Sequence, residues 1–203
     1  KIMWFENPGN PKNIWKYHHV GNMNFAFGCA LGDMDEDGQL DIIVSAGYYY
    51  QDGIRMYYTS DPKGNWNYRR ISGSAYYCGA INITDMNKDG HLDVLVTING
   101  YSGQANIYRN PLPGKNPRSV QWAQITAVGG LQYPYEVLPI DINDDGNLDV
   151  VVSSNYGGIK WGEAPSNPNS TGGWSSFTMD SSINYPWGLD VTDVDNDGYD
   201  DVF

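Results

Sequence analysis

Asp33-Met-Asp-Glu-Asp-Gly-Gln-Leu-Asp41 is the first of four closely similar segments in this sequence. The other three align with it without a gap: Asp85-Met-Asn-Lys-Asp-Gly-His-Leu-Asp93, Asp141-Ile-Asn-Asp-Asp-Gly-Asn-Leu-Asp149 and Asp193-Val-Asp-Asn-Asp-Gly-Tyr-Asp-Asp201. Their first aspartates stand 52, 56 and 52 positions apart. A motif that recurs at this interval indicates a chain built from structural repeats of about 50 residues.

Strand signals recur around each segment. Short β-branched apolar runs follow the first three segments: Ile42-Ile43-Val44, Val94-Leu95-Val96 and Val150-Val151-Val152. Such runs predict strands that are buried on both faces. A second strand carries a central aromatic residue, which is Trp4, Tyr57, Tyr108 or Trp161. A third strand opens with Trp15, Trp66, Trp122 or Trp174, and we expect these tryptophans to pack between neighbouring repeats.

With the strand that leads into each Asp-rich segment, every repeat holds four strands. Four short strands per repeat predict an all-β fold, a β-propeller of four-stranded antiparallel blades. We predict that residues 1–203 form a single propeller domain or a propeller fragment, with three whole blades and two half blades. Two arrangements of the ring fit this count of blades. In the first, the chain is part of a seven- or eight-bladed ring, and in the second, its own ends meet and close a four-bladed ring. Open ends would favour self-association, because an unpaired sheet edge pairs with another chain.

Charge and composition exclude several classes of function. The formal net charge is −12, and more than half of the 24 acidic residues lie in the four repeated segments. No basic stripe is present that could meet phosphates, so we expect no nucleic-acid partner. No apolar run is long enough for a membrane span. The two cysteines, Cys29 and Cys78, fall in equivalent strands of neighbouring repeats, and we expect free thiols, although a bridge between them is conceivable.

The repeated segment has the chemistry of a loop that binds a hard cation. Oxygen ligands stand at positions 1, 3 and 5, a backbone carbonyl follows at position 7, and Ca²⁺ prefers about 6–8 such oxygens. The glycine at position 6 permits a sharp turn. An EF-hand loop needs a glutamate at position 12, where this chain has Val44, Val96 or Val152. The sequence therefore predicts a metal loop between two strands, with its closing carboxylate at position 9.

These segments resemble the FG-GAP/VCBS repeat family, which is defined by an Asp-x-Asp-x-Asp-Gly-x-x-Asp loop before an apolar strand. The resemblance covers nearly the whole chain and extends to the propeller head of integrin α subunits. It implies up to four Ca²⁺ ions, one in each loop, on the lower face of the propeller, with ligands approaching the upper face. The implied calcium ligands are Asp33, Asp35, Asp37, Gln39 and Asp41 in the first loop, Asp85, Asn87, Asp89, His91 and Asp93 in the second, Asp141, Asn143, Asp145, Asn147 and Asp149 in the third, and Asp193, Asp195, Asp197, Tyr199 and Asp201 in the fourth.

Aromatic residues recur at a second position, at the start of each inner strand. If the metal loops end these strands at the lower face, the aromatics begin them at the upper face. The connections after the next strand return to the same face and add further tyrosines. The candidate ligand-binding residues are Phe25, Phe27, Tyr48, Tyr49, Tyr77, Tyr101, Tyr133, Tyr135, Tyr156, Tyr185 and Trp187.

Three functions are compatible with these patterns. Tyrosine and tryptophan rings stack on sugars and satisfy their hydroxyls, which favours a secreted lectin-like module that binds a glycan or an extracellular protein. The alternatives are the propeller domain of a polysaccharide lyase or hydrolase, with Glu136 and Asp190 as a carboxylate pair, and a structural module without a small ligand. No nucleophile with a partnered base stands out, so we assign no catalytic residue. Millimolar extracellular calcium suits such loops, so we expect an extracellular location, with the secretion signal outside this chain.

Overall fold

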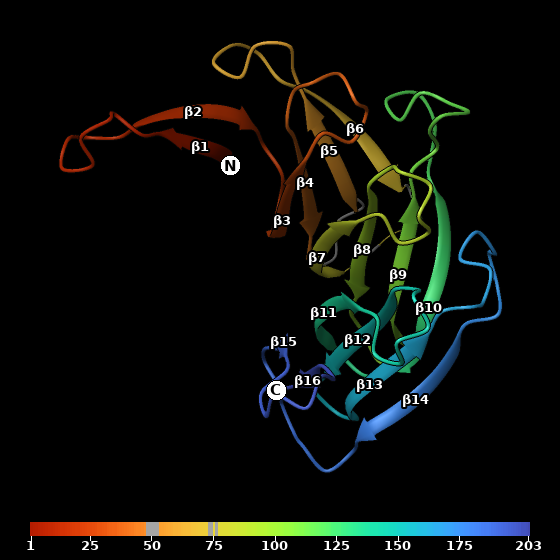
Figure 1. The fold of residues 1–203 in the computed structure, drawn as a ribbon. Coiled ribbons are helices and arrows are strands. Elements are labelled where there is room, and N and C mark those ends of the chain that lie inside the picture. Colours follow the sequence, from red (N-terminus) through yellow and green to blue (C-terminus); the bar gives the residue numbers. More distant parts are fainter. Residues whose placement is uncertain (48–52, 73–74, 76) are drawn as a thin grey trace.

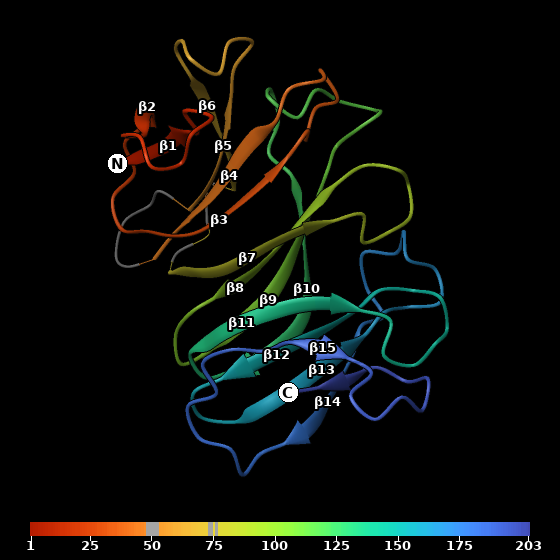
Figure 2. The same cartoon turned by 60° about the vertical axis from the view of Figure 1, so that its left-hand side comes forward.

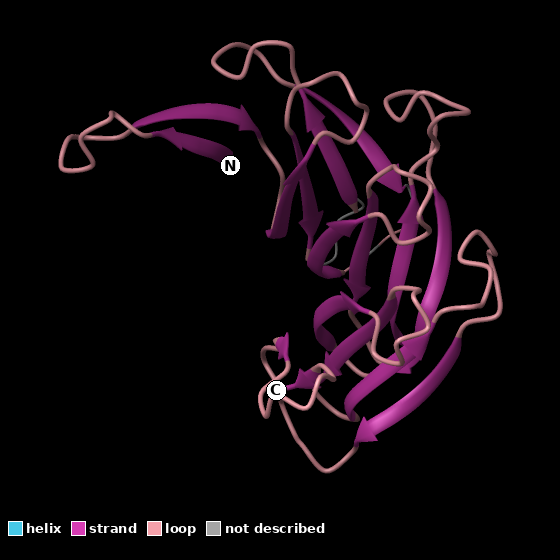
Figure 3. Cartoon of the chain, in the orientation of Figure 1, coloured by secondary structure: helices cyan, strands magenta, loops and turns pink. Residues whose placement is uncertain are grey.

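The computed structural model describes residues 1–47, 53–72, 75 and 77–203, and these residues form strands and loops without any helix (Figure 3). The first four-stranded antiparallel sheet contains β3 (Ala26–Gly32), β4 (Asp41–Ala46), β5 (Ile54–Tyr58) and β6 (Asn67–Ser72). The second contains β7 (Cys78–Thr84), β8 (Asp93–Ile98), β9 (Gly103–Arg109) and β10 (Ala123–Leu131). The third contains β11 (Pro134–Ile140), β12 (Asp149–Ser154), β13 (Gly158–Glu163) and β14 (Ser175–Asp180).

Two-stranded sheets flank these three. Strand β1 (Ile2–Glu6) pairs with β2 (Lys16–Gly21), and β15 (Val191–Thr192) pairs with β16 (Asp201–Val202). The predicted all-β fold with three whole blades and two half blades is therefore confirmed. The segments that lead into β4, β8, β12 and β16 are called loops 1 to 4. They are residues 33–41, 85–93, 141–149 and 193–201, and each ends on the first residue of its strand.

The sheets follow one another around an arc, with β3, β7 and β11 on its concave side and β6, β10 and β14 on its convex side (Figure 1). In the rotated view, β3, β7 and β11 lie side by side (Figure 2), and the contacts between β3 and β7 and between β7 and β11 agree with that view. Neighbours in each sheet are consecutive in the chain, as in a propeller blade. The arrangement is therefore β-propeller-like.

Apolar side chains fill the space between consecutive sheets. Ile43 of β4 packs with Val94 and Val96 of β8 in one buried cluster, while Leu95 of β8 packs with Val150 of β12 in the next. Successive residues of a strand point to opposite faces, so an apolar run supplies both neighbouring interfaces. The predicted burial of these runs on both faces is confirmed, since β4 and β12 are buried along their whole length.

The recurring tryptophans precede the outer strands by one residue instead of opening them. Trp122 is only 4 % exposed and packs in the cluster of Ile43, Ile54 and Met56, which belong to the preceding sheet. Trp174 is partly buried against the second sheet in the same way. The indole Nε1–H of Trp122 donates to the carbonyl oxygen of Pro117 in its own loop at 3.3 Å. The predicted packing between repeats is thus confirmed for these two tryptophans.

Loops between the third and fourth strands of a sheet reach back over the lower face of the preceding sheet. In residues 59–66, the carbonyl oxygen of Pro62 accepts a hydrogen bond from Trp4 Nε1 at 3.1 Å. In residues 164–174, Asn169 Oδ1 accepts one from Asn87 Nδ2 in loop 2 at 2.8 Å. Residues 110–122 contact loop 1 in the same manner, through Arg118. Each loop of this kind therefore ties one sheet to the preceding one.

No helix that could span a membrane occurs in the part of the chain described here.

We predict that Trp122→Ala lowers the free energy of unfolding by about 3–5 kcal/mol, because it leaves a cavity between two sheets. Trp15→Ala is the matched control, since Trp15 occupies the equivalent position but is 41 % exposed, and we expect a loss below about 1 kcal/mol. Urea unfolding followed by tryptophan fluorescence and circular dichroism measures both losses. Equal losses for the two variants would contradict the assignment of Trp122 to the sheet interface.

Candidate functional site

The four Asp loops share one hydrogen-bond pattern. In each, an oxygen of the position-1 aspartate accepts the backbone N–H of position 5 at 3.1 Å. The other oxygen accepts the N–H of the position-6 glycine at 2.8–3.0 Å. The position-5 aspartate accepts the N–H of position 7 at 2.7–3.0 Å. The loops are therefore built alike, and their local structure is fixed by their own carboxylates.

Two residues of every loop have a left-handed backbone. The position-6 glycines have φ between 85° and 95°, a conformation that suits glycine. Position 4 has φ between 54° and 63°, although it is occupied by Glu36, Lys88, Asp144 and Asn196. A left-handed conformation at a residue other than glycine costs free energy, and it persists only where the surroundings hold it. The two turns therefore recur at the same positions in all four loops.

In loops 1 and 4, carboxylate oxygens of positions 1, 3 and 5 lie within 4.8 Å of one another. These are Asp33, Asp35 and Asp37, and Asp193, Asp195 and Asp197. Loops 2 and 3 have an asparagine at position 3, so they bring fewer carboxylates together. The position-9 aspartates Asp41 and Asp201 are not members of the two clusters. The structure thus gathers three of the five predicted side-chain and backbone ligands, and it gives position 9 another contact.

The position-9 aspartate joins the start of its loop to the strands of the sheet. Asp93 is fully buried, and its two oxygens accept the N–H groups of Asn110 at 2.7 Å and of Met86 at 3.3 Å. Asp149 similarly accepts the N–H of Ala164 at 2.7 Å, and Asp41 that of Met34 at 3.0 Å. This clamp fixes the point at which the loop enters the second strand.

Burial of the position-9 aspartates changes their protonation. Desolvation raises the pKa of Asp41 and of Asp93 from the ordinary value of 3.8 to about 7. The same cause raises the pKa of Asp149 to about 6. For Asp41, the nearby charge of Asp35 adds to the effect. A positive charge in the loop would lower the pKa values of these aspartates, because it favours their charged form.

Several buried oxygens of the loops have no hydrogen-bond partner among the described residues. They include the position-3 oxygens Asp35 Oδ1 and Asn87 Oδ1, and the position-9 oxygens Asp41 Oδ1 and Asp149 Oδ2. A buried acceptor without a partner is costly, and a coordinated cation would remove that cost. The donor set is all oxygen, which is the set that Ca²⁺ prefers. The residues present therefore fit a hard divalent cation.

Loops 1 and 2 contact each other through their side chains. His91 Nδ1 lies 2.5 Å from Glu36 Oε1, and the Glu36 carboxylate raises the pKa of His91. The side chain of His91 is thus engaged with the neighbouring loop, while its backbone keeps the position-7 geometry of Gln39, Asn147 and Tyr199. The contact between His91 and Glu36 therefore joins loop 1 to loop 2.

The predicted aromatic residues gather at the opposite ends of the inner strands. Tyr101 meets Tyr133 edge to face at a centroid distance of 5.1 Å, and Tyr133 meets Tyr156 at 6.3 Å. Tyr156 meets Tyr185 at 5.3 Å, and their hydroxyls lie 2.8 Å apart. Across the same face, Trp187 stacks on Tyr135 at 4.7 Å. Six of the predicted rim residues therefore form contacting sets that join the second and third sheets to the segment before β15.

The backbone at this face is strained in a regular way. Phe25, Tyr77, Tyr133 and Tyr185 all have φ between 51° and 58°, which is unusual for bulky residues. Directly after the first three of them, the pairing of inner and second strands shifts register. A register shift of this kind re-aims side chains next to a site. The left-handed residues and the register shifts thus occur together at the end of the inner strands where the aromatic residues gather.

A cavity of about 580 Å³ lies among these aromatics. Phe27, Tyr77, Tyr101, Tyr133 and Tyr135 line it, together with Gly47, Cys78, Asn99 and Gly100. Tyr101 and Phe27 are exposed, at 77 % and 62 %. Phe25 is exposed as well, but it is not among the residues that line the cavity. The predicted rim residues Tyr48 and Tyr49 lie outside the described residues.

Two polar groups of this face escaped the sequence analysis. Asn99 Oδ1 is buried without a hydrogen-bond partner among the described residues, and Asn99 lines the cavity. Ser45 Oγ accepts the N–H of Gly28 at 3.0 Å and donates to Gly79 O of the next sheet at 2.6 Å. The hydroxyls Ser45, Thr97 and Ser153 stand four positions after the last aspartate of their loops, and this constant offset was the signal that could have found them.

Neither carboxylate of the alternative enzymatic site lines the cavity. Glu136 lies on β11, where desolvation raises its pKa, and its N–H donates to Ser153 Oγ at 3.2 Å. Asp190 is exposed, and its backbone pairs with that of Phe203. Cys29 is exposed and Cys78 is buried, and both thiols are free, so no bridge joins them.

A comparison with protein families matches residues 85–152 to the FG-GAP-like repeat. The matched part runs from loop 2 to the middle of β12 and therefore contains loops 2 and 3 with the strands between them. The resemblance on which the sequence analysis relied is confirmed for this part of the chain. No curated protein matches the chain.

We predict that the cation-free protein loses stability as the pH rises from about 4 to about 7. The pKa values of Asp41 and Asp93 are raised to about 7 on folding, so the folded state holds protons that the unfolded chain has released above about pH 4. Stability is therefore present at low pH and declines as the pH rises through the folded pKa. Melting temperatures in EDTA at several pH values measure this decline.

Asp93→Asn should flatten that pH dependence, because an asparagine stays neutral throughout the range. Asp200→Asn is the control, since Asp200 is an exposed acid of loop 4. A decline of the same steepness in Asp93→Asn and in the wild type would refute the role of the buried clamp.

Proposed function

We propose that this protein is a secreted, calcium-stabilised binding module that recognises a carbohydrate through its aromatic upper face, in the manner of a lectin. The observation that carries the proposal is the cavity of about 580 Å³ lined by five aromatic residues. Ligand sites typically measure about 300–1,000 Å³ and combine apolar walls with a few convergent polar groups. An aromatic rim over a cavity of this size has the form of such a site.

The chemistry of the lining favours a sugar over a purely apolar ligand. Sugar rings offer an apolar face that stacks on tyrosine or tryptophan, and hydroxyls that need hydrogen-bond partners. Asn99 Oδ1 supplies a buried acceptor at the cavity, and the tyrosine hydroxyls supply donors and acceptors at its edge. A protein partner is the second candidate, since exposed rings such as Tyr101 and Trp187 also suit a protein interface.

Calcium has a structural role in this proposal. Each loop joins the first two strands of a sheet, so a cation held there would fix the sheet from its lower end. The buried oxygens of Asp35, Asn87 and Asp41 that lack partners support a bound cation, and an all-oxygen set favours Ca²⁺ over Mg²⁺, which retains several waters. Such loops suit the millimolar calcium outside cells, which is why we propose an extracellular location.

We expect calcium to raise the melting temperature and EDTA to lower it. At a calcium concentration about 100 times the dissociation constant, one site contributes about 2.7 kcal/mol of stability. Calorimetry with CaCl₂, MgCl₂ and EDTA measures the effect, and Mg²⁺ at the same concentration should give a smaller shift. A melting temperature that is the same in CaCl₂ and in EDTA would exclude a structural calcium.

We expect Tyr101→Ala and Tyr135→Ala to weaken glycan binding at least about tenfold, which corresponds to about 1.4 kcal/mol for one lost stacking partner. A glycan array identifies the ligand, and titration calorimetry on the strongest hit gives the affinities. Tyr17→Ala is the matched control, because Tyr17 is 63 % exposed on β2 and does not line the cavity.

In calcium, Tyr101→Ala should keep the melting temperature of the wild type, because the Tyr101 ring is 77 % exposed. Tyr135→Ala should lower it slightly, because that variant also loses the stack on Trp187 and the hydrogen bond from Asn155. Unchanged affinity in both of them would reject the upper face as the binding site. An array without any hit, combined with capture of a protein ligand that depends on Tyr101, would favour the protein partner.

A further inference from the structure

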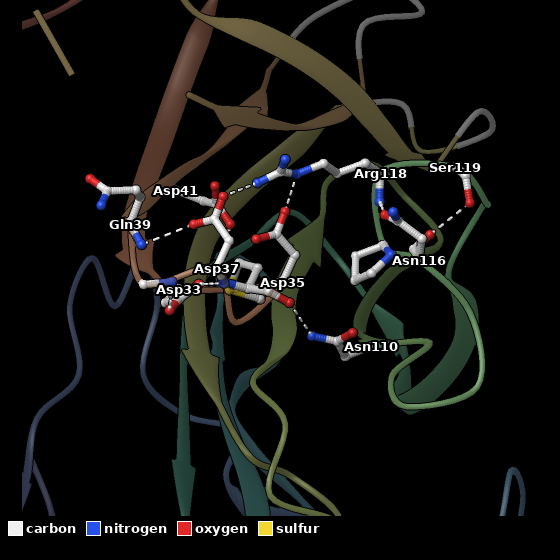
Figure 4. Close-up of polar contacts among 12 residues, drawn as sticks. Asp33, Asp35, Asp37, Gln39, Asp41, Asn110, Asn116, Arg118 and Ser119 are labelled. Atoms are coloured by element: carbon white, nitrogen blue, oxygen red, sulfur yellow. Dashed lines mark hydrogen bonds and ion pairs between the residues drawn. The ribbon is translucent and has the colours of Figure 1, made fainter. Parts of the chain in front are cut away.

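Loop 1 differs from the other loops in that an arginine forms salt bridges with two of its carboxylates. The guanidinium of Arg118 donates from Nε to Asp35 Oδ2 and from Nη2 to Asp37 Oδ2 (Figure 4). These are two of the three residues whose oxygens converge in loop 1. Arg118 belongs to the loop between β9 and β10, so it comes from the next sheet.

The position of Arg118 is fixed by its own surroundings. Its Cζ lies 4.4 Å from the centroid of the Tyr58 ring, and such a cation–π contact is favourable. Its backbone N–H donates to Asn116 Oδ1 at 2.8 Å, and Ser119 Oγ donates to the carbonyl oxygen of Asn116 at 2.9 Å. The side chain of Asp35 is only 5 % exposed, so its pairing with Arg118 occurs away from bulk water.

Loop 4 provides an internal comparison. It has the same three aspartates, Asp193, Asp195 and Asp197, and gathers their oxygens within the same 4.8 Å. In the described part of the chain, no salt bridge joins these three residues to an arginine or a lysine. In loop 2, Arg109 lies nearby, but its Nη2 donates to the carbonyl oxygen of Pro168.

We propose that Arg118 is a built-in competitor for the cation of loop 1 and thereby makes loop 1 the weaker of the two three-aspartate sites. The inference rests on the proposed calcium binding. A divalent ion bound by Asp33, Asp35 and Asp37 draws on the same carboxylates that Arg118 occupies, and like charges exclude each other at this distance. Binding of the ion therefore releases the guanidinium from these carboxylates.

This exchange couples the ion to the junction between two sheets. Without the ion, Arg118 ties loop 1 to residues 110–122 of the second sheet. With the ion, that tie is lost. A cavity of about 410 Å³ then provides room for the side chain to move, and it is lined by Asp35, Asp37, Arg118 and the segment from Leu112 to Pro117. Loop 1 is thus a site at which calcium both stabilises one sheet and loosens its contact with the next.

The test is a calcium titration of the full chain, observed by NMR at the backbone amides of Gly38 and Gly198. Each of these N–H groups donates to the position-1 aspartate of its own loop, so each reports on one site. We expect Arg118→Met to lower the calcium midpoint at Gly38 by about tenfold, because charge-assisted hydrogen bonds to the carboxylates no longer compete. The midpoint at Gly198 should not change.

Arg69→Met is the matched control. Arg69 has the same charge and donates to the carbonyl oxygen of Ser119, in the same loop as Arg118. Among the described residues, no hydrogen bond or ion pair joins Arg69 to loop 1. We expect it to shift either midpoint by less than about twofold. An unchanged or higher midpoint at Gly38 in Arg118→Met would overturn the proposal, since Arg118 would then be neutral or would support the site.

A second measurement distinguishes competition from a simple packing effect. If the ion displaces Arg118, then Arg118→Met lowers the melting temperature in EDTA but leaves it unchanged in saturating CaCl₂. An equal loss in both conditions overturns the exchange. The proposed function fails separately: if neither Gly38 nor Gly198 responds to calcium in any variant, calcium binding itself is refuted, and the inference falls with it.

Discussion

The structure depends on the hydrogen bonds that the first aspartate of each loop makes to the backbone of its own loop. Asp33 accepts the N–H groups of Asp37 and Gly38, and the equivalent aspartates do the same in the other three loops. These bonds close the chain between the first and second strands of a sheet and fix how the apolar run that follows enters the sheet. Ile43 and its counterparts can then pack between sheets, because the loop sets the residue at which the run begins.

The two ends of the inner strands are chemically opposite for a geometric reason. Strand β3 has seven residues, and at about 3.3 Å per residue it separates its ends by about 20 Å. Acidic loops gather at one end and aromatic rings at the other, so a cation at the lower end cannot touch a ligand at the upper end. The proposed calcium therefore contributes to recognition only through the rigidity of the strands, while Tyr101 and Tyr135 would contact the ligand.

Neighbouring sheets are joined by apolar packing and by polar contacts of very different kinds. Trp122 fills the interface from the outer side, and Ser45 Oγ joins the inner strands of two sheets through Gly79 O. At the lower face, the contacts differ from one junction to the next, with Arg118 reaching loop 1 and Asn169 reaching loop 2. Repeats that share one local plan thus acquire individual properties at their junctions.

The sequence by itself determined the repeat, the four strands in each unit, the composition of the Asp loops and the register of the aromatic residues. All of these depend on spacings within about 50 residues, and the chemistry of a short segment fixes them. Tertiary structure alone decided that Arg118 lies on Asp35, 83 positions away, that Trp187 stacks on Tyr135, and that position 9 clamps the backbone. These contacts depend on how each sheet is placed against the next and on left-handed residues such as Glu36 and Tyr133. No local sequence pattern reveals either feature, because the direction of a side chain follows from backbone angles that packing imposes.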